Sequence, residues 1–279
     1  MASGRPLLIP LGGPGQWDAR VVGGKAAKLA ELSLAGFDVP QGFCLTTRAY
    51  EAFVNDAGIA AAISMELGRK SMDDMRWEEI WDTALRIRAR FLAQPLSGSL
   101  RETIAAGLRG FDAGASLAVR SSAVGEDPAG RSFAGLHESI IGVRGRQAVE
   151  DAIRLVWASL WSDAALLYRK ELGLDPAHSR MAVLVQEMVD ADPSGVAFAR
   201  DPRDTRKEHA VIEAVPGACS LLVDGLVDPD HWELDRRTHA IITWLPGQRD
   251  DKEHPTPLLE PRDLEQILET LLSVEQQFG

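Results

Sequence analysis

The spacing of apolar residues changes near Ser116, and this change limits the possible folds more than any other feature of the sequence. Upstream, apolar residues recur every three or four positions, as in "KAAKLAELSLAG" and over residues 77–92 and 99–108, which predicts amphipathic helices. Downstream, short runs rich in β-branched residues, such as "SLAVRSS", "MAVLVQEMV" and "HAVIEAV", predict strands. Helices followed by a strand-rich region indicate an α/β or α+β protein with two lobes.

Two further apolar stripes predict long helices. The stretch "AVEDAIRLVWASLWSDAALLYRKELGL" keeps its apolar residues on one helical face and predicts a single helix that ends at Gly173. We interpret its two tryptophans, Trp157 and Trp161, as core residues. The stripe from Leu264 to Leu272 predicts an amphipathic helix near the C-terminus.

The charge balance excludes some classes of partner. With 30 Lys and Arg against 41 Asp and Glu, the formal net charge is −11, so phosphate polymers and anionic membranes are repelled unless cations cluster locally. We therefore expect no nucleic-acid and no membrane partner. Apolar runs such as "MAVLV" fall far short of the roughly 20 residues of a membrane helix, and a cytoplasmic location is expected.

The glycine pair before Lys25 is the first candidate ligand site. In "GGKAAKLAEL", backbone N–H groups and one ammonium at the start of a helix could hold a phosphate. The spacing is not that of a P-loop. The alternative interpretation is a glycine-rich turn with a solvated lysine.

A second basic site lies in "LAVRSSAVGEDPAGRSFAGLHES". Arg120 ends an apolar strand, where its guanidinium could bind a phosphate through two hydrogen bonds. The small residues that follow, up to Gly135, are typical of a lid that closes over phosphates. The alternative is an ordinary surface loop in which Arg120 pairs with Glu126 or Asp127.

A third candidate site is the kink after "VLVQEMV". Two strands flank a short polar segment, residues 190–194, whose backbone groups could recognise an adenine edge, with the amide of Gln186 adding a donor and an acceptor. A strand that carries one exposed glutamine is the alternative.

Taken in order, these motifs resemble one known family. The chain is similar to the N-terminal ATP-binding domain of phosphoenolpyruvate synthase and pyruvate phosphate dikinase, and most similar in character to the rifampin phosphotransferases. The resemblance covers nearly the whole chain and implies an ATP-grasp fold whose two lobes, residues 1–188 and 189–279, clamp ATP and Mg²⁺. It rests on "VGGKAAKLAEL", "VPQGFCLTTRAYEAF", "AVRSSAVGED", "SFAGLHESI", "VWASLWSDAALLYR", "VLVQEMV" and "SGVAFARDP".

The resemblance also implies roles for residues near the phosphates. Lys25 and Arg120 match the family's phosphate-binding lysine and arginine and are the expected catalytic residues. Gly135 and Ser139 match lid residues that touch the phosphates, with Ser139 in the place of the usual threonine. These matches agree with the phosphate sites suggested by the residues themselves.

For the adenine, the resemblance points to the end of one strand. Gln186 matches the glutamine of the adenine pocket, and Glu187 and Met188 are its backbone neighbours. Glu213, on a later strand, is the best local candidate for a carboxylate beside the nucleotide, and the metal ligands are otherwise unassigned.

Two departures from the family pattern affect the expected activity. In one turn, the Leu, Gly and Glu that are usual in the family are replaced by Ala218, Cys219 and Ser220. The chain also stops at Gly279, where the family continues into strands with a metal ligand and a Gln-x-Arg motif, so we expect the second lobe to be incomplete. The swivelling phosphohistidine domain and the acceptor-binding domain are expected as partners, in cis or in trans.

The implied function is that of the ATP-binding part of a dikinase-type phosphotransferase. ATP would be split to AMP and phosphate through a phosphohistidine, and the phosphoryl group passed to an acceptor such as pyruvate or an antibiotic hydroxyl. The first alternative is a degenerate nucleotide-binding or scaffold module without chemistry of its own. The second is a small-molecule kinase that acts directly from ATP and uses Glu213 at its metal.

Overall fold

The computed structural model describes residues 6–13, 17–124, 137–204, 206–247 and 256–278. The chain divides into two compact units, Met1–Met188 and Val189–Gly279. Each combines helices with an antiparallel sheet, so the fold is α+β.

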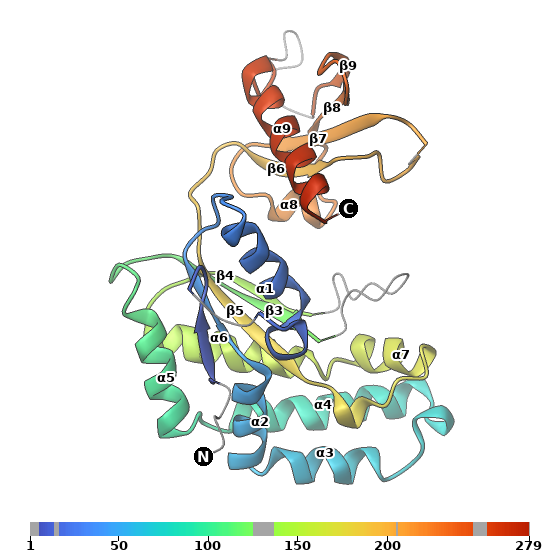
Figure 1. Ribbon diagram of the computed structural model, residues 1–279. Coiled ribbons are helices and arrows are strands. Elements are labelled where there is room, and N and C mark those ends of the chain that lie inside the picture. Colours follow the sequence, from blue (N-terminus) through green and yellow to red (C-terminus); the bar gives the residue numbers. More distant parts are fainter. Residues whose placement is uncertain (1–5, 14–16, 125–136, 205, 248–255, 279) are drawn as a thin grey trace. The chain divides into compact units, whose positions relative to one another are not determined.

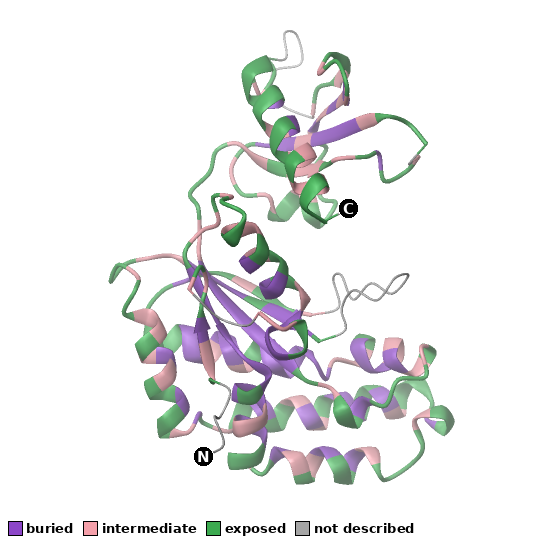
Figure 2. Ribbon diagram, in the orientation of Figure 1, coloured by how far each residue is buried: buried purple, intermediate pink, exposed green. Residues whose placement is uncertain are grey.

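The first unit is organised around a five-stranded antiparallel sheet. Its strand order is β1-β2-β5-β3-β4, so the central strand β5 pairs with β2 and β3, which come from distant parts of the sequence. Strand β5, "MAVLVQE", is buried along almost its whole length because helices cover it on both faces (Figure 2). The strands are β1 (Leu8–Pro10), β2 (Gly42–Leu45), β3 (Leu117–Ala123), β4 (Ser139–Val143) and β5 (Met181–Glu187).

Six helices pack against one face of this sheet and form the main core (Figure 1). Val119, Val183 and Val185 point into this core from the strands, and the buried side chains of Phe53 and Trp157 stack on each other at 5.2 Å between ring centroids. The helices are α2 (Thr47–Asp56), α3 (Ile59–Leu67), α4 (Trp77–Ala93), α5 (Gly98–Leu108), α6 (Arg146–Ser159) and α7 (Asp163–Glu171), with short 3₁₀ turns at Met72–Asp74 and Pro176–His178.

The opposite face of the sheet carries helix α1 (Ala19–Leu34). A smaller buried cluster forms there, in which Val22 and Ala26 of the helix meet Ala182 and Leu184 of β5. The helix begins at Asp18, whose side chain accepts the N–H of Arg20 at 2.9 Å. Helix α1 thus covers a sheet face to which β2, β5 and β3 contribute.

The prediction of one long helix up to Gly173 is wrong, because α6 ends at Ser159 and α7 begins at Asp163. Ser162 caps α7 by accepting the N–H of Ala165 at 3.1 Å. Arg169 reaches back and donates to the carbonyl of Leu160, which satisfies the end of α6. Both tryptophans are buried as predicted, at 0% and 1% exposure.

The second unit is a four-stranded antiparallel sheet with one long helix on one face. Alternation puts Ala210, Ile212 and Ala214 on the side of α9, where they meet Leu264 and Leu268. The elements are β6 (Ser194–Phe198), β7 (His209–Val215), α8 (Ser220–Val223), β8 (Asp230–Asp235), β9 (Ile241–Leu245) and α9 (Pro261–Phe278).

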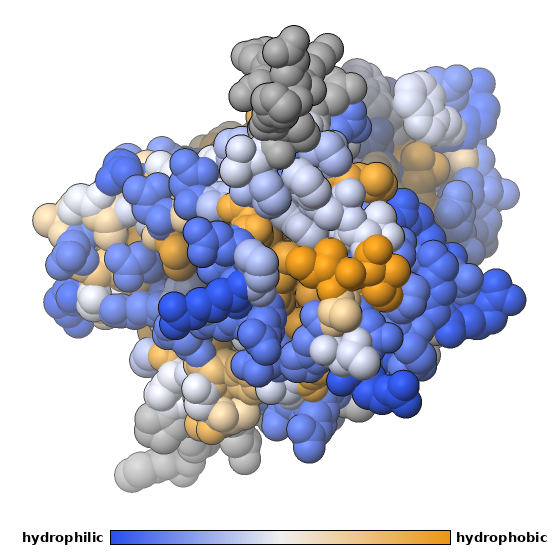
Figure 3. Space-filling view, turned by 90° about the horizontal axis from the view of Figure 1, so that it is seen from above, coloured by the Kyte–Doolittle hydropathy of each residue, from blue (hydrophilic) through white to orange (hydrophobic). Residues whose placement is uncertain are grey.

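No helix in the described part of the chain is long and apolar enough to cross a membrane. Hydrophilic side chains cover most of the face seen in Figure 3, and a hydrophobic patch interrupts them.

Candidate functional site

Strand register places three of the proposed site residues on one face of the first sheet. Arg120 of β3 is paired with both Ser139 of β4 and Leu184 of β5, and Gln186 is paired with Ala118, two residues before Arg120. Paired residues on antiparallel strands point to the same face. Because Leu184 packs against α1, this is the face that carries α1.

Arg120 and Ser139 are exposed on this face. Helix α1 lies over β2, β5 and β3. Among the described residues, no carboxylate lies within 4.0 Å of the Arg120 guanidinium. Glu126 and Asp127, the alternative partners of Arg120, lie outside the described residues, as does Gly135 with the proposed lid.

Lys25 is positioned by an unusually close contact between α1 and β3. Gly23 has a φ of 75° and ψ of 167°, which interrupts the helix two residues before Lys25. A Cβ on Gly23 would lie 2.0 Å from the carbonyl oxygen of Ser122, so only glycine fits. The backbone N–H of Ala26 then donates to the Ser122 hydroxyl at 3.1 Å.

This contact seats Lys25 beside the strand that carries Arg120. Ser122 lies two residues from Arg120 on the same strand and on the same face. The exposed residues Lys25 and Arg120 therefore lie in the same region of this sheet face. Sequence reasoning missed Ser122, although its place two residues after Arg120 was a usable signal.

His137 lies in the same region. Burial, together with the positive charges of Arg169 and Lys25, lowers its pKa to about 4, against a hydrogen bond at Ser159 that raises it. His137 is therefore neutral near pH 7, and the Lys25 ammonium is near enough to act on it electrostatically.

The stability of the first unit should depend on pH through His137. Because an unfolded histidine titrates near 6.5, the unfolded chain binds more protons than the folded one between pH 6.5 and 4. The stabilisation is complete above pH 6.5 and is lost as the pH falls, by up to about 3 kcal/mol. Urea unfolding at pH 7 and pH 5 should show a smaller difference for His137→Gln than for the wild type. An identical difference in both, or the same reduction in the exposed control His178→Gln, would contradict this.

The residues proposed to bind the adenine lie at the end of β5 and form hydrogen bonds to neighbouring segments of the chain. Gln186 is 6% exposed and donates from Nε2 to the carbonyl of Pro40 at 3.0 Å. The amide can thus offer a ligand its oxygen and one remaining N–H. The N–H of Glu187 donates to the carbonyl of Gln41 at 2.9 Å.

Met188 is held in a similar way. Its N–H donates to the carbonyl of Ser116 at 2.9 Å, and its sulfur accepts the N–H of Gly142 at 3.0 Å. The backbone N–H groups of residues 187 and 188 are therefore used within the protein, which leaves their carbonyls and residues 189–193 as the backbone groups that could meet a base.

Glu213 belongs to the second unit. It lies on β7 opposite His231 of β8, and its Oε1 is 3.0 Å from His231 Nδ1. Both side chains are on the sheet face opposite α9, because the alternate residues of β7 pack against that helix.

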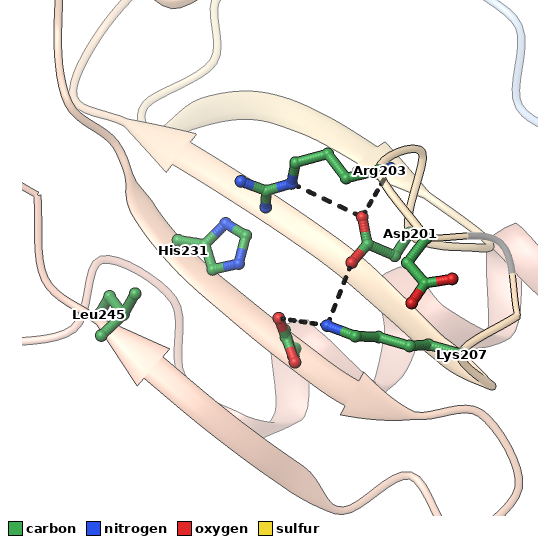
Figure 4. A pocket seen from close by; sticks show the side chains of 7 residues that line it. Asp201, Arg203, Lys207, His231 and Leu245 are labelled. Carbon is green, nitrogen blue, oxygen red and sulfur yellow. Dashed lines mark hydrogen bonds and ion pairs between the residues drawn. The ribbon is translucent and has the colours of Figure 1, made fainter.

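An open pocket of about 440 Å³ lies on this same sheet face, next to His231 (Figure 4). Asp201, almost fully buried, accepts the N–H of Arg203 at 2.9 Å and forms ion pairs with Arg203 and Lys207 at 3.6 Å. The Arg203 N–H, together with the two cations, holds the pKa of Asp201 below its usual value. Lys207 also lies 3.8 Å from Glu233, so the cations of this pocket are matched by acids of the protein itself.

The two units, with an exposed cationic face in the first, define a mixed α+β protein of the nucleotide-binding type. Residues 19–254 match the family model described as pyruvate phosphate dikinase, AMP/ATP-binding domain, and the chain belongs to this family. The resemblance inferred from the motifs is confirmed.

Curated relatives support the same assignment. A phosphoenolpyruvate synthase of Aeropyrum pernix is 38% identical over 80% of this chain and 28% of its own length. A probable phosphoenolpyruvate synthase of Methanothermobacter thermautotrophicus is 31% identical over 84% and 35%, and a rifampicin phosphotransferase of Streptomyces sviceus is 35% identical over 93% and 32%. The chain spans about a third of the length of these relatives.

Proposed function

We propose that this chain binds ATP with Mg²⁺ in an ATP-grasp arrangement and acts as the nucleotide-binding part of a dikinase-type phosphotransferase. The observation that supports the proposal is a sheet face that carries Arg120 and Ser139 and against which the start of α1, with Lys25, packs through Ser122. Two exposed cations and a hydroxyl on one face suit an anionic ligand, and the family membership identifies that ligand by class as an adenine nucleotide.

The proposed roles follow from this placement. Lys25 and Arg120 hold the phosphates and neutralise the charge that develops during transfer, and Ser139 donates its hydroxyl from the paired position on β4. Gly135 is proposed to close over the phosphates. Gln186 offers its remaining amide groups to the adenine, with the carbonyls of Glu187 and Met188 beside it.

Mg²⁺ would be held chiefly by the nucleotide. A hard cation prefers oxygen ligands, and Mg²⁺ in phosphoryl-transfer sites is held by substrate phosphates with one or two carboxylates. Glu213 is the carboxylate we propose for it, since its second oxygen is not used by His231. When bound, the ion would offset phosphate charge.

The overall reaction is proposed from what the family resemblance implies. ATP is split to AMP and inorganic phosphate, and one phosphoryl group passes through a histidine on another domain or chain to an acceptor such as pyruvate or an antibiotic hydroxyl. Named relatives include synthases of phosphoenolpyruvate and phosphotransferases of rifampicin, which is why both acceptor classes are considered.

Calorimetric titration of the 279-residue chain with a non-hydrolysable ATP analogue tests the first step. We expect one binding site, with tighter binding when Mg²⁺ is present, because the cation offsets phosphate charge. Absence of binding at millimolar nucleotide would contradict the proposal.

Product analysis tests the chemistry, with the histidine domain supplied in cis or in trans. AMP with inorganic phosphate supports the proposed reaction, whereas ADP would indicate direct transfer to an acceptor. Binding without turnover would favour a nucleotide-binding module, a role that the changed turn at Ala218 to Ser220 also suggests.

A further inference from the structure

Three side chains of the second unit, none of them among the residues proposed for the nucleotide, bring their ligand atoms together. Ligand atoms of His239, Glu265 and Glu269 all lie within 4.8 Å of one another. His239 is on the turn between β8 and β9, and the two glutamates are one helical turn apart on α9. The cluster thus joins two elements that are separate in the sequence.

The backbone around this cluster is fixed on both sides. In the turn, Asp235 Oδ1 accepts the N–H groups of Arg237 and Thr238 at 2.9 and 2.7 Å, and the N–H of His239 donates to the Asp235 carbonyl at 2.9 Å. On the helix, the residues immediately before the two glutamates, Leu264 and Leu268, are buried against the sheet. This packing prevents α9 from rotating about its own axis. The two glutamates therefore stay on the side of the helix that faces the turn.

His239 has a left-handed backbone conformation, with a φ of 60°. Glycine would adopt this conformation without strain, and asparagine is also tolerated there. Histidine is also one of the non-glycine residues found more often than others in this conformation, and the side chain of His239 is half-buried.

The two glutamates bring two negative charges to the cluster. Carboxylates one turn apart on a helix repel each other. In the part of the chain that the structure describes, no lysine or arginine lies within 4.0 Å of either carboxylate. A bound cation would remove this repulsion.

We propose that His239, Glu265 and Glu269 bind one divalent transition-metal ion of the Zn²⁺ class. A mixed nitrogen and oxygen set suits Zn²⁺ or Co²⁺, whereas Mg²⁺ and Ca²⁺ prefer oxygen alone. In a tetrahedral site with ligand bonds near 2.0 Å, ligand atoms are about 3.3 Å apart, which small rotations of the exposed glutamates reach. The ion joins the β8–β9 turn to α9, and water completes its coordination.

Titration with Co²⁺, followed by visible absorption, and with Zn²⁺, followed by calorimetry, tests this site in the full chain without nucleotide. We expect one ion per chain, and affinity lower by about tenfold or more in His239→Asn and in Glu265→Gln/Glu269→Gln. Asparagine keeps the left-handed turn, and glutamine keeps the helix, so both variants should fold. The control His178→Ala removes an exposed imidazole beside Asp175 and should leave binding unchanged.

Three results would overturn the proposal. The first is that neither metal binds when it is in roughly 100-fold excess over the protein, a condition chosen to fill a site whose Kd is in the micromolar range. The second is undiminished metal binding in both His239→Asn and Glu265→Gln/Glu269→Gln. The third is binding that is lost in His231→Asn instead, which places the ion at the Glu213 pair. Nucleotide binding is measured separately, so the fate of the ATP proposal does not decide this one.

Discussion

Replacing Lys25 or Arg120 by alanine should weaken binding of the ATP analogue at least about tenfold. Each substitution removes a charge-assisted contact to a phosphate from an exposed position on the face that carries α1. The calorimetric titration described above measures the effect, and circular dichroism checks that each variant is folded.

The matched control for these variants is Arg20→Ala. Arg20 is on the same helix as Lys25, but its guanidinium pairs with Asp18 at 2.9 Å and its side chain is 83% exposed. It should bind nucleotide like the wild type. Equal affinity in Lys25→Ala, Arg120→Ala and the wild type would remove the phosphate-site assignment while leaving the family membership untouched.

Replacing Gly23 by alanine should have the largest effect on stability, lowering the free energy of unfolding of the first unit by about 3 kcal/mol or more. The φ of 75° and ψ of 167° strain any other residue, and the added Cβ would meet the backbone oxygen of Ser122 at 2.0 Å. Because β3 is a central strand, the backbone there has little room to shift. Urea unfolding measures the loss.

Gly58→Ala is the control that separates strain from contact. Gly58 also has a positive φ, 65°, but no atom lies within 4 Å of an added Cβ, so the expected cost is only about 1–2 kcal/mol. If both variants lost the same stability, the close approach of α1 to β3 would not be what requires glycine. Gly23→Ala should also weaken nucleotide binding, since this contact positions Lys25.

Much of the secondary structure was predictable because it depends on residues a few positions apart. The spacing of apolar residues in α4 and α9, and the β-branched runs of β3, β5 and β7, each indicated the correct element. Strand β8 was not predicted, because in "DHWELD" the apolar side chains are limited to Trp232 and Leu234 between charged or polar neighbours. Its burial depends on α9, which comes much later in the chain.

The break between α6 and α7 shows a similar limit. The apolar stripe continues through Leu160 and Trp161, so periodicity alone favours one helix. The chain turns there because Ser162 caps the next helix and Arg169 binds the last carbonyl of the previous one. The helix cap at Ser162 could have been predicted from the sequence. The contact of Arg169 with the end of the preceding helix could be known only from the folded structure.

By itself, the sequence determined the types of most elements, the family, and the residue types suited to phosphate, since these depend on local spacing and on ordered motifs. Only the tertiary structure decided that Arg120 and Ser139 share a face, that Ser122 seats the start of α1, and that His239 meets the glutamates of α9. Strand register and helix packing join residues far apart in the chain, and no local pattern fixes which of them meet.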